Sequence, residues 1–541
     1  GSLSGGIGAD LFGSEGGPCG VALNSAAGKI YWANFNGGEI RVGNIDGSGG
    51  ASTLIAGQDH PCGVAVDPAA GRIYWAEFCQ IPGPTCGTIR GADLSNVSGT
   101  AETLVDGEAG PSGVTVDPAA GKIYWTNQSP NGTPPGSVRR ANLDGTGVET
   151  VVDNQANPIG VAIDAGKIYW ANLGPCCSGP GAIRVADLAN VSGTTTTLFS
   201  GELGPAGVAI DPTASPSPQI YWGTFGGGTV RAGNLDGSGG ASTLISGESF
   251  ANFPVLLRAP TGTEPPAISS GVGGELTCSQ GSWAPDLLAS FLFRAPATFA
   301  YQWKRNGANI ATGATFTPTE PGDYTCTVTA TNQAGSASQT SVAFNVPVPE
   351  ITELSPAHGW IGLKNSDDQG TQFDLRAELL KNGTPVASGL KRCITGVTRN
   401  PALATEAVVP WDAFAPVSTS PGDTLSLRFS TRIGTNPADT SKCAGPGGSH
   451  SNAVGLRLYY GSATRPSAFD VTIDPSPSQT LYLGSNGSPC ANQESTGVTS
   501  RFLDSTSPSA ANAKCKDSAA VKFGSGNAWK EIGTWYLDPL P

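Results

Sequence analysis

The sequence has no methionine, only three histidines and few charged residues in a length of 541. Charged side chains make up 13 % of it, about half of their share in an average soluble protein. It also lacks any run of roughly 18 consecutive apolar residues, so no membrane-spanning helix is predicted. Because the initiator is missing, we expect a secreted protein from which a signal peptide has been removed.

Basic residues are outnumbered by acidic ones. Lys and Arg number 30 and Asp and Glu number 43, which gives a net charge of −13. Such a surface repels nucleic acid and anionic lipid, so neither is predicted as a partner. The sequence also has no P-loop, no His-Glu-x-x-His and no Gly-x-Ser-x-Gly elbow. We therefore expect the protein not to be an enzyme.

Glycine, proline and cysteine are plentiful, at 76, 42 and 12 residues. The first two favour strands joined by turns over helices. The cysteines are even in number and form no Cys-x-x-Cys pair, which predicts disulfides and an extracellular or cell-surface location. The length suggests three or four domains.

A repeat organises the first half of the chain. The motif Ile-Tyr-Trp occurs at Ile30–Trp32, Ile73–Trp75, Ile123–Trp125, Ile168–Trp170 and Ile220–Trp222. Each copy follows a Gly-Val run and precedes a short run that ends in Arg, and a fourth apolar segment closes the unit. Four short β-rich runs with a period of about 40 to 50 residues predict the blade of a β-propeller.

Counting strands predicts six blades. Residues 11–20 align without gaps on residues 198–207, so the N-terminus supplies a sixth outer strand. Residues 253–257 follow the fifth outer strand in the place of a sixth inner strand. We predict a propeller whose sixth blade is truncated and closed by both chain ends, which would remove free sheet edges. A five-bladed ring is the alternative.

The combination of Gly63–Asp67, Ile73–Trp75 and Asn142–Gly145 resembles the YWTD repeats of low-density-lipoprotein-receptor class B propellers. The resemblance covers residues 8–258 and implies a β-propeller. The family has Thr-Asp after Tyr-Trp, where the first repeat here has Ala33-Asn34. The pattern is also similar to bacterial streptogramin-lyase-like propellers, which implies a metal and a catalytic His inside the ring.

Two further β domains are predicted beyond a Pro- and Gly-rich linker. Cys278, Trp303 and Cys326, with Tyr324 two residues before the last of them, resemble a bacterial immunoglobulin-like module. The remaining residues alternate apolar and polar positions, which predicts one β-sandwich. The fold class is therefore all-β. We place the propeller at 1–260, the immunoglobulin-like domain at 265–347 and the sandwich at 350–541.

Ten cysteines are candidates for disulfides: Cys19, Cys62, Cys79, Cys86, Cys278, Cys326, Cys393, Cys443, Cys490 and Cys515. For three pairs the partner is suggested because it is the nearest cysteine in the same region, namely Cys79 with Cys86, Cys393 with Cys443, and Cys490 with Cys515. The sequence leaves the pairing within the propeller open.

Loop lengths predict a binding face. Three consecutive blades have an enlarged loop after Tyr-Trp, at residues 79–87, 128–137 and 173–181. In a propeller these loops share a face with the loops between blades, so we predict an asymmetric wall around one mouth of the channel. The residues assigned to this wall are Cys79, Cys86, Gln128, Asn131, Cys176 and Cys177.

The loops between blades add one oxygen-bearing side chain per blade. These residues are Glu15, Gln58, Glu108, Gln155, Glu202 and Glu248. Arranged around one mouth, these side chains could bind calcium or a basic group, because calcium prefers oxygen ligands. The alternative is that they have no binding role and are simply an exposed polar loop residue that recurs with the repeat. Within the propeller, His60 is the single weak candidate for a catalytic base.

Three functions remain open. The first is a bacterial surface-binding or adhesion protein that binds a protein or glycan at one propeller face. The second is a structural subunit whose partners are copies of itself. The third is a propeller lyase or lactonase.

Overall fold

The computed structural model describes residues 10–78, 86–128, 136–174, 180–271, 274–365, 368–420, 422–435, 443, 454–459, 467–474, 479–484, 500–504, 518–523 and 528–537. The chain divides into two compact units, residues 1–317 with 325–343, and residues 318–324 with 344–541. None of the helices in the described part is long and apolar enough to span a membrane. The three domain boundaries given above remain predictions.

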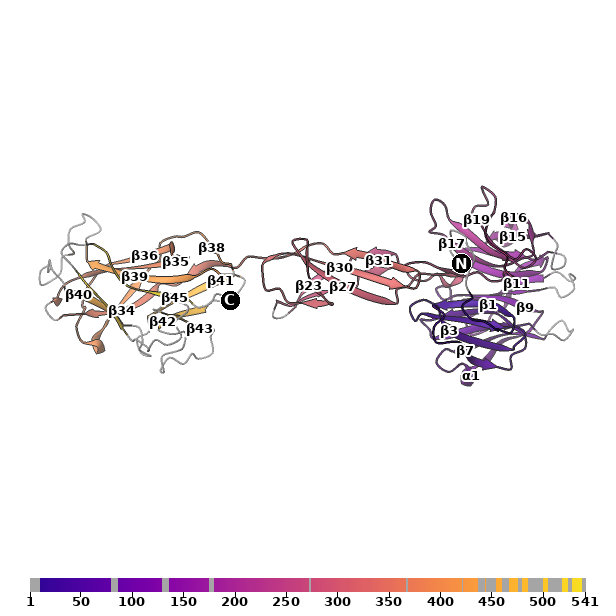
Figure 1. The fold of residues 1–541 in the computed structure, drawn as a ribbon, viewed down its shortest axis with the longest axis horizontal. Helices are drawn as coiled ribbons and strands as arrows, with labels where there is room; N and C mark the ends of the chain where they lie inside the picture. Colours follow the sequence, from indigo (N-terminus) through magenta and orange to yellow (C-terminus); the bar gives the residue numbers. More distant parts are fainter. Residues whose placement is uncertain are drawn as a thin grey trace. The chain divides into compact units, whose positions relative to one another are not determined.

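Among the described residues, the repeats form five four-stranded antiparallel sheets, coloured indigo to magenta in Figure 1. The first blade has β1 (Pro18–Asn24), β2 (Lys29–Asn34), β3 (Glu39–Asn44) and β4 (Ser52–Ala56). The second has β5 (Pro61–Asp67), β6 (Arg72–Glu77), β7 (Gly87–Asp93), the short helix α1 (Val97–Thr100) and β8 (Glu102–Glu108). The third has β9 (Pro111–Asp117), β10 (Lys122–Asn127), β11 (Gly136–Asn142) and β12 (Glu149–Gln155).

The fourth and fifth blades follow the same order. The fourth has β13 (Pro158–Asp164), β14 (Lys167–Asn172), β15 (Pro180–Asp187), helix α2 (Val191–Thr194) and β16 (Thr196–Leu203). The fifth has β17 (Pro205–Asp211), β18 (Gln219–Thr224), β19 (Thr229–Asn234) and β20 (Ser242–Ser246). Each predicted repeat is thus one blade, which confirms the propeller.

Glycine in the inner strands explains how closely the blades meet. A Cβ placed on Gly63 of β5 would lie 2.3 Å from the carbonyl oxygen of Ser112 on β9, and one on Gly113 would lie 2.2 Å from that of Ile159 on β13. Any larger residue would push the inner strands apart. The Gly of each Gly-Val run therefore sets the narrow centre of the ring.

Segments from outside the repeats fill the sixth position. Phe12 stacks on Trp32 of the first blade at 4.8 Å between ring centroids, as Phe199 stacks on Trp222 of the fifth at 4.9 Å. Phe253 lies against Gly207, where a sixth inner strand would run. Both chain ends thus take their predicted places, although residues 10–17 form no strand.

The sixth position also contains a strand that was not predicted, β26 (Leu292–Phe293). It pairs in parallel with β21 (Leu256–Leu257) and lies beyond the predicted end of the propeller. Leu292 and Phe293 share an apolar cluster with Leu23 of the first blade and Ile210 of the fifth. An insertion in the following domain therefore helps to close the ring.

The same insertion covers one end of the channel. Its short 3-10 helix η2 (Leu288–Ser290) packs on the inner strands of blades two to five. Ser290 Oγ donates to the carbonyl oxygen of Ile163 at 2.8 Å and also contacts Asp164. Burial raises the pKa of the Asp164 carboxyl. Burial, together with the negative charges of Asp164 and Asp187, raises the pKa of the Tyr169 hydroxyl to about 12. The insertion therefore packs over this end of the channel.

The middle region has short strands around Trp303. They are β22 (Gly262–Glu264), β23 (Ile268–Ser270), β24 (Leu276–Cys278), β25 (Ser282–Trp283), β27 (Thr298–Arg305), β28 (Ala308–Thr312), β29 (Thr315–Phe316), β30 (Gly322–Asn332), β31 (Gly335–Thr340) and β32 (Phe344–Val346). Cys278 and Cys326 form a disulfide, and Trp303 is fully buried. The Tyr324 hydroxyl donates to the Glu320 carbonyl. These features agree with an immunoglobulin-like module, which stays an interpretation.

In the C-terminal unit the described strands join one hydrogen-bonded sheet network around a single apolar core. They are β33 (Glu350–Leu354), β34 (Ala357–Leu363), β35 (Phe373–Lys381), β36 (Thr384–Ile394), β37 (Thr405–Val409), β38 (Val417–Ser418), β39 (Leu425–Ile433), β40 (Gly455–Tyr459), β41 (Ala468–Asp474), β42 (Gln479–Gly484), β43 (Ser500–Asp504), β44 (Ser518–Lys522) and β45 (Lys530–Leu537), with a 3-10 helix η4 (Pro401–Leu403). The sandwich assignment remains a prediction.

Candidate functional site

A cavity of about 530 Å³ lies at the open mouth of the propeller channel. Loops after the second strand of each blade line it, together with residues 17–19 and 249–253 that lead into inner-strand positions. The two loop sets that we predicted to share a face therefore border one cavity. Its volume falls in the range of about 300 to 1,000 Å³ that is typical of small-molecule sites.

Aromatic rings dominate the lining of this mouth. They belong to Phe35, Phe78, Phe225, Phe250 and Phe253. Phe35 and Phe78 lie 5.9 Å apart between ring centroids, and Phe225 and Phe250 lie 4.6 Å apart. We call these five residues the phenylalanine rim.

The rim follows a rule that our sequence reading missed. The position three residues after each Trp of the repeat points to the mouth, and it holds Phe35, Phe78, Gln128, Leu173 and Phe225 in turn. Because the second strand of each blade ends at the preceding residue, this side chain leaves the sheet at the same height in every blade. Aligning the repeats by their Trp would have revealed it.

A disulfide braces the floor of the mouth. Cys19 of β1 and Cys62 of β5 are bonded, which joins the inner strands of the first two blades, and both line the cavity. The cross-link closes a loop of 43 residues and stiffens the floor before any ligand arrives.

Phe250 is the most exposed residue of the rim. Its side chain is 62 % exposed and its backbone has a φ of +64°, in the left-handed region that residues other than glycine rarely adopt. An exposed aromatic side chain on a strained backbone is typical of functional surfaces.

Among the described residues, the lining of this mouth has no charged side chain. Its polar members are Asn36, Ser112, Gln128, Ser249 and Asn252. Amides and hydroxyls can orient a ligand by hydrogen bonds, and the rings supply apolar contact area.

The oxygen-bearing side chains between blades do not ring the mouth as we predicted. Glu108 is buried and accepts hydrogen bonds from Trp125 Nε1 at 2.8 Å and Asn127 Nδ2 at 2.6 Å, and it pairs with Arg139. Glu15, Gln58, Gln155 and Glu202 likewise each accept the indole N–H of the Trp in the blade that follows them. They hold adjacent blades together, so they are not available to a cation.

Glu248 differs from the other five because it is exposed. The blade that would follow it has no Ile-Tyr-Trp strand, so no indole N–H reaches it. This exception supports the reading that the Trp of the next blade buries each of the others.

The structure describes only some of the remaining predicted site residues. Gln128 lines the mouth, and Cys86 is disulfide-bonded. Cys79, Asn131, Cys176, Cys177, Cys490 and Cys515 lie outside the described residues. His60 has a φ of +48°, contacts Asp59 at 2.6 Å and packs edge-on against Phe35, so it stands beside the rim.

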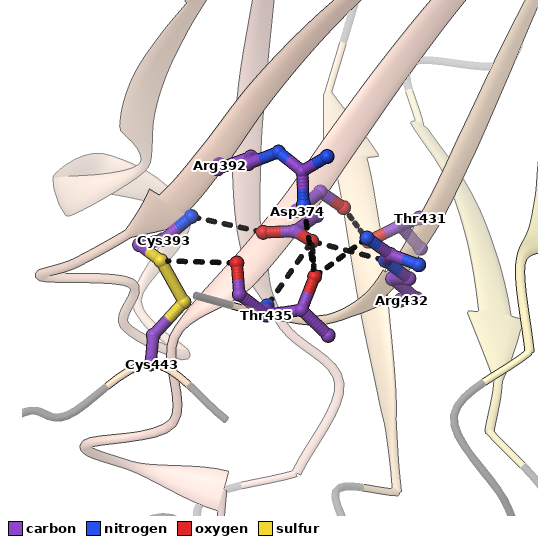
Figure 2. Close-up of polar contacts among 7 residues, drawn as sticks. All are labelled: Asp374, Arg392, Cys393, Thr431, Arg432, Thr435 and Cys443. Atoms are coloured by element: carbon purple, nitrogen blue, oxygen red, sulfur yellow. Dashed lines mark hydrogen bonds and ion pairs between the residues drawn. A yellow bond between two sulfur atoms is a disulfide. The ribbon is translucent and has the colours of Figure 1, made fainter. Parts of the chain in front are cut away.

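The described residues contain one group with metal-ligand character, Asp374 with Cys393 and Cys443. Figure 2 shows why it does not fit a metal. The two cysteines form a disulfide, so neither offers a thiolate. The Asp374 carboxylate accepts from the Cys393 amide at 2.9 Å, from Arg432 Nε at 3.0 Å and from the Thr435 hydroxyl at 2.9 Å. These bonds give the carboxylate a structural role.

No protein-family model and no curated protein matches the chain. Solved structures with similar propellers include a nidogen/laminin complex, at 21 % identity over 42 % of this chain and 80 % of that one, with a TM-score of 0.35. A gluconolactonase from Xanthomonas campestris is 18 % identical over 50 % of this chain and 85 % of that one, with a TM-score of 0.36. A luciferin-regenerating enzyme is 14 % identical over 50 % and 85 %, with a TM-score of 0.34.

These similarities concern the fold of the propeller, because a shared fold does not carry a function with it. Our prediction that the protein is not an enzyme is nevertheless wrong, because it excluded an enzymatic function. It rested on missing motifs, and the similar propellers include a gluconolactonase and a luciferin-regenerating enzyme.

Proposed function

We propose that the protein is an extracellular binding protein that holds an apolar group of a protein or glycan at the phenylalanine rim. The observation that supports this most directly is a mouth with five aromatic rings over a disulfide-braced floor. The three disulfides among the described residues agree with an oxidising location.

The shape of the site favours recognition. The insertion packs over the far end of the channel, and the rim lines the other end, where the cavity lies. Rigid aromatic side chains contribute large contact areas at a low entropic cost, and such residues dominate the energy of many interfaces. The immunoglobulin-like and C-terminal regions would then serve as spacer and attachment modules.

Substitution of the rim tests the proposal. The full chain is applied, without reductant, to an array of glycans and extracellular-matrix proteins beside Phe250→Ala and Phe225→Ala. Each substitution removes an anchor, so we expect affinity for any bound component to fall at least about tenfold. The matched control is Leu403→Ala, a residue that is also 62 % exposed but lies in the C-terminal unit.

Unchanged binding by both Phe variants would contradict a site at the rim. If no component is bound, the structural-subunit alternative gains weight, and light scattering over a concentration series would then detect self-association.

A further inference from the structure

The C-terminal unit has a cavity of its own, of about 750 Å³. Its lining comes from the end of β33, the segment after β37 and strand β41. The lining residues are Glu353, Leu354, Ser355, Trp411, Asp412, Ala413, Phe414, Asp470 and Thr472. None of them belongs to the propeller mouth, so this is a separate site.

Trp411 is held rigidly at this cavity. Its indole Nε1 donates to the carbonyl oxygen of Ser355 at 2.7 Å, and its ring lies 5.7 Å from that of Phe469. Gly389 pairs with Trp411 across an isolated bridge, and a Cβ on Gly389 would lie 2.2 Å from the Pro410 carbonyl oxygen. The glycine therefore allows the Trp411 segment to approach β36, and the indole becomes a fixed wall.

Two of the acidic residues are also positioned by the backbone. The amide of Asp412 donates to the Ser388 carbonyl at 2.7 Å, and the Ser388 hydroxyl donates to the Asp412 carboxylate at 3.0 Å. Glu353 directly follows an irregularity in the pairing of β33 with β41. Such bulges redirect the side chains next to them and are common beside functional sites.

The charge of the lining is one-sided. Glu353, Asp412 and Asp470 are exposed carboxylates, and the described lining residues include no Lys, Arg or His. These three carboxylates do not come together as a metal-ligand group. An indole is the aromatic ring that attracts organic cations most strongly, and Phe414 and Leu354 offer apolar contact to a hydrocarbon chain.

We propose that this cavity binds an organic cation, namely an ammonium or guanidinium group carried on a hydrocarbon chain. The carboxylates neutralise the charged head, and Trp411 and Phe414 pack against the head and the chain. The ligand is either a free amine or a Lys or Arg side chain of a peptide, since both present the same chemistry.

Calorimetry on the full chain tests this proposal. The probes are cadaverine as the free amine, and N-acetyl-lysine amide and N-acetyl-arginine amide as the peptide side chains, with N-acetyl-norleucine amide as the uncharged analogue. We expect at least one cationic probe to bind at least about tenfold more tightly than the norleucine probe, and its binding to weaken as salt is added. Preference for cadaverine or for the amino-acid amides distinguishes the two sources.

The variant Glu353→Gln with Asp412→Asn removes two charges and keeps the shape of the lining. We expect it to weaken binding of the cation about tenfold while the melting temperature stays unchanged. Asp144→Asn, at an exposed carboxylate in the propeller, is the matched control and should bind as the unmodified chain does. Equal binding of the norleucine probe, undiminished binding by the double variant, or no binding of any cation at millimolar concentration would each overturn the proposal.

Discussion

At the scale of single residues, one unit recurs at the junctions between blades. A Glu or Gln from one blade accepts the indole N–H of the next blade's Trp, and an Arg lies over the ring of that Trp. The Arg-to-ring distances run from 5.6 to 6.0 Å in the five blades. A buried indole N–H needs a hydrogen-bond acceptor, so the Glu or Gln side chain stabilises the junction between the two blades.

We expect Glu108→Ala to destabilise the propeller by about 3 kcal/mol. The substitution leaves the Trp125 indole N–H, the Asn127 amide and the Arg139 guanidinium without their shared acceptor. Glu108→Gln should cost only about 1 kcal/mol, because Gln58 and Gln155 fill the same position in other blades. Urea unfolding followed by tryptophan fluorescence measures both.

Glu248→Ala is the control for this prediction. It occupies the equivalent position but is exposed, so its effect should stay within about 0.5 kcal/mol. Equal losses for Glu108→Ala and Glu248→Ala would show that the indole contact does not matter.

At the scale of elements, the insertion at 286–293 determines how the ring is completed. Asp286 accepts hydrogen bonds from the amides of Arg294 and Ala295 and from the Ser25 hydroxyl of the first blade. Leu292 and Phe293 then enter the apolar cluster between the first and fifth blades. The propeller and the insertion therefore share one core.

We expect Phe293→Ala to lower the stability of the propeller by about 3 to 5 kcal/mol, although the residue lies outside the repeats. Its side chain is 1 % exposed, and truncation leaves a cavity between blades. Limited proteolysis of the blades should speed up accordingly. Ile310→Ala, at a 40 % exposed position of the same region, should leave the cleavage rate unchanged.

At the scale of the whole molecule, each apolar cluster of the described residues lies within a single unit. One apolar cluster lies entirely within the C-terminal unit, and the clusters of the blades lie within the first. Units with separate cores are expected to unfold separately.

We predict two transitions in scanning calorimetry of the full chain, and Leu427→Ala should lower only one of them. Leu427 is fully buried in the C-terminal core, and its truncation should cost about 2 to 5 kcal/mol. Phe293→Ala should lower the other transition. A single transition that shifts with both substitutions would contradict independent unfolding.

The sequence predicted much of this structure because its signals are local. Each Ile-Tyr-Trp copy became the second strand of a blade, and Asn382 and Gly383, both with positive φ, form the tight turn that an Asn-Gly pair favours. Cys393 with Cys443 was the sequence-nearest candidate pair, and Cys278 with Cys326 belonged to the immunoglobulin-like pattern; both pairs are bonded. Strand periodicity and turn residues depend on positions close in sequence.

The candidate site was harder to predict. Glu108 and its equivalents were predicted to be exposed loop residues, because the indoles that bury them lie 15 to 20 residues further along the chain, in the next blade. The phenylalanine rim escaped notice because its members meet only when the blades close into a ring.

The sequence by itself thus determined the all-β class, the blade repeat and several of its disulfides, since each follows from short-range patterns of polarity and turn chemistry. Only the tertiary structure decided that a segment beyond the repeats, at residues 286–293, completes the sixth position and packs over one end of the channel. It also decided which side chains face the other mouth. These outcomes depend on packing between segments far apart in sequence, and no local pattern encodes which distant surface buries a given side chain.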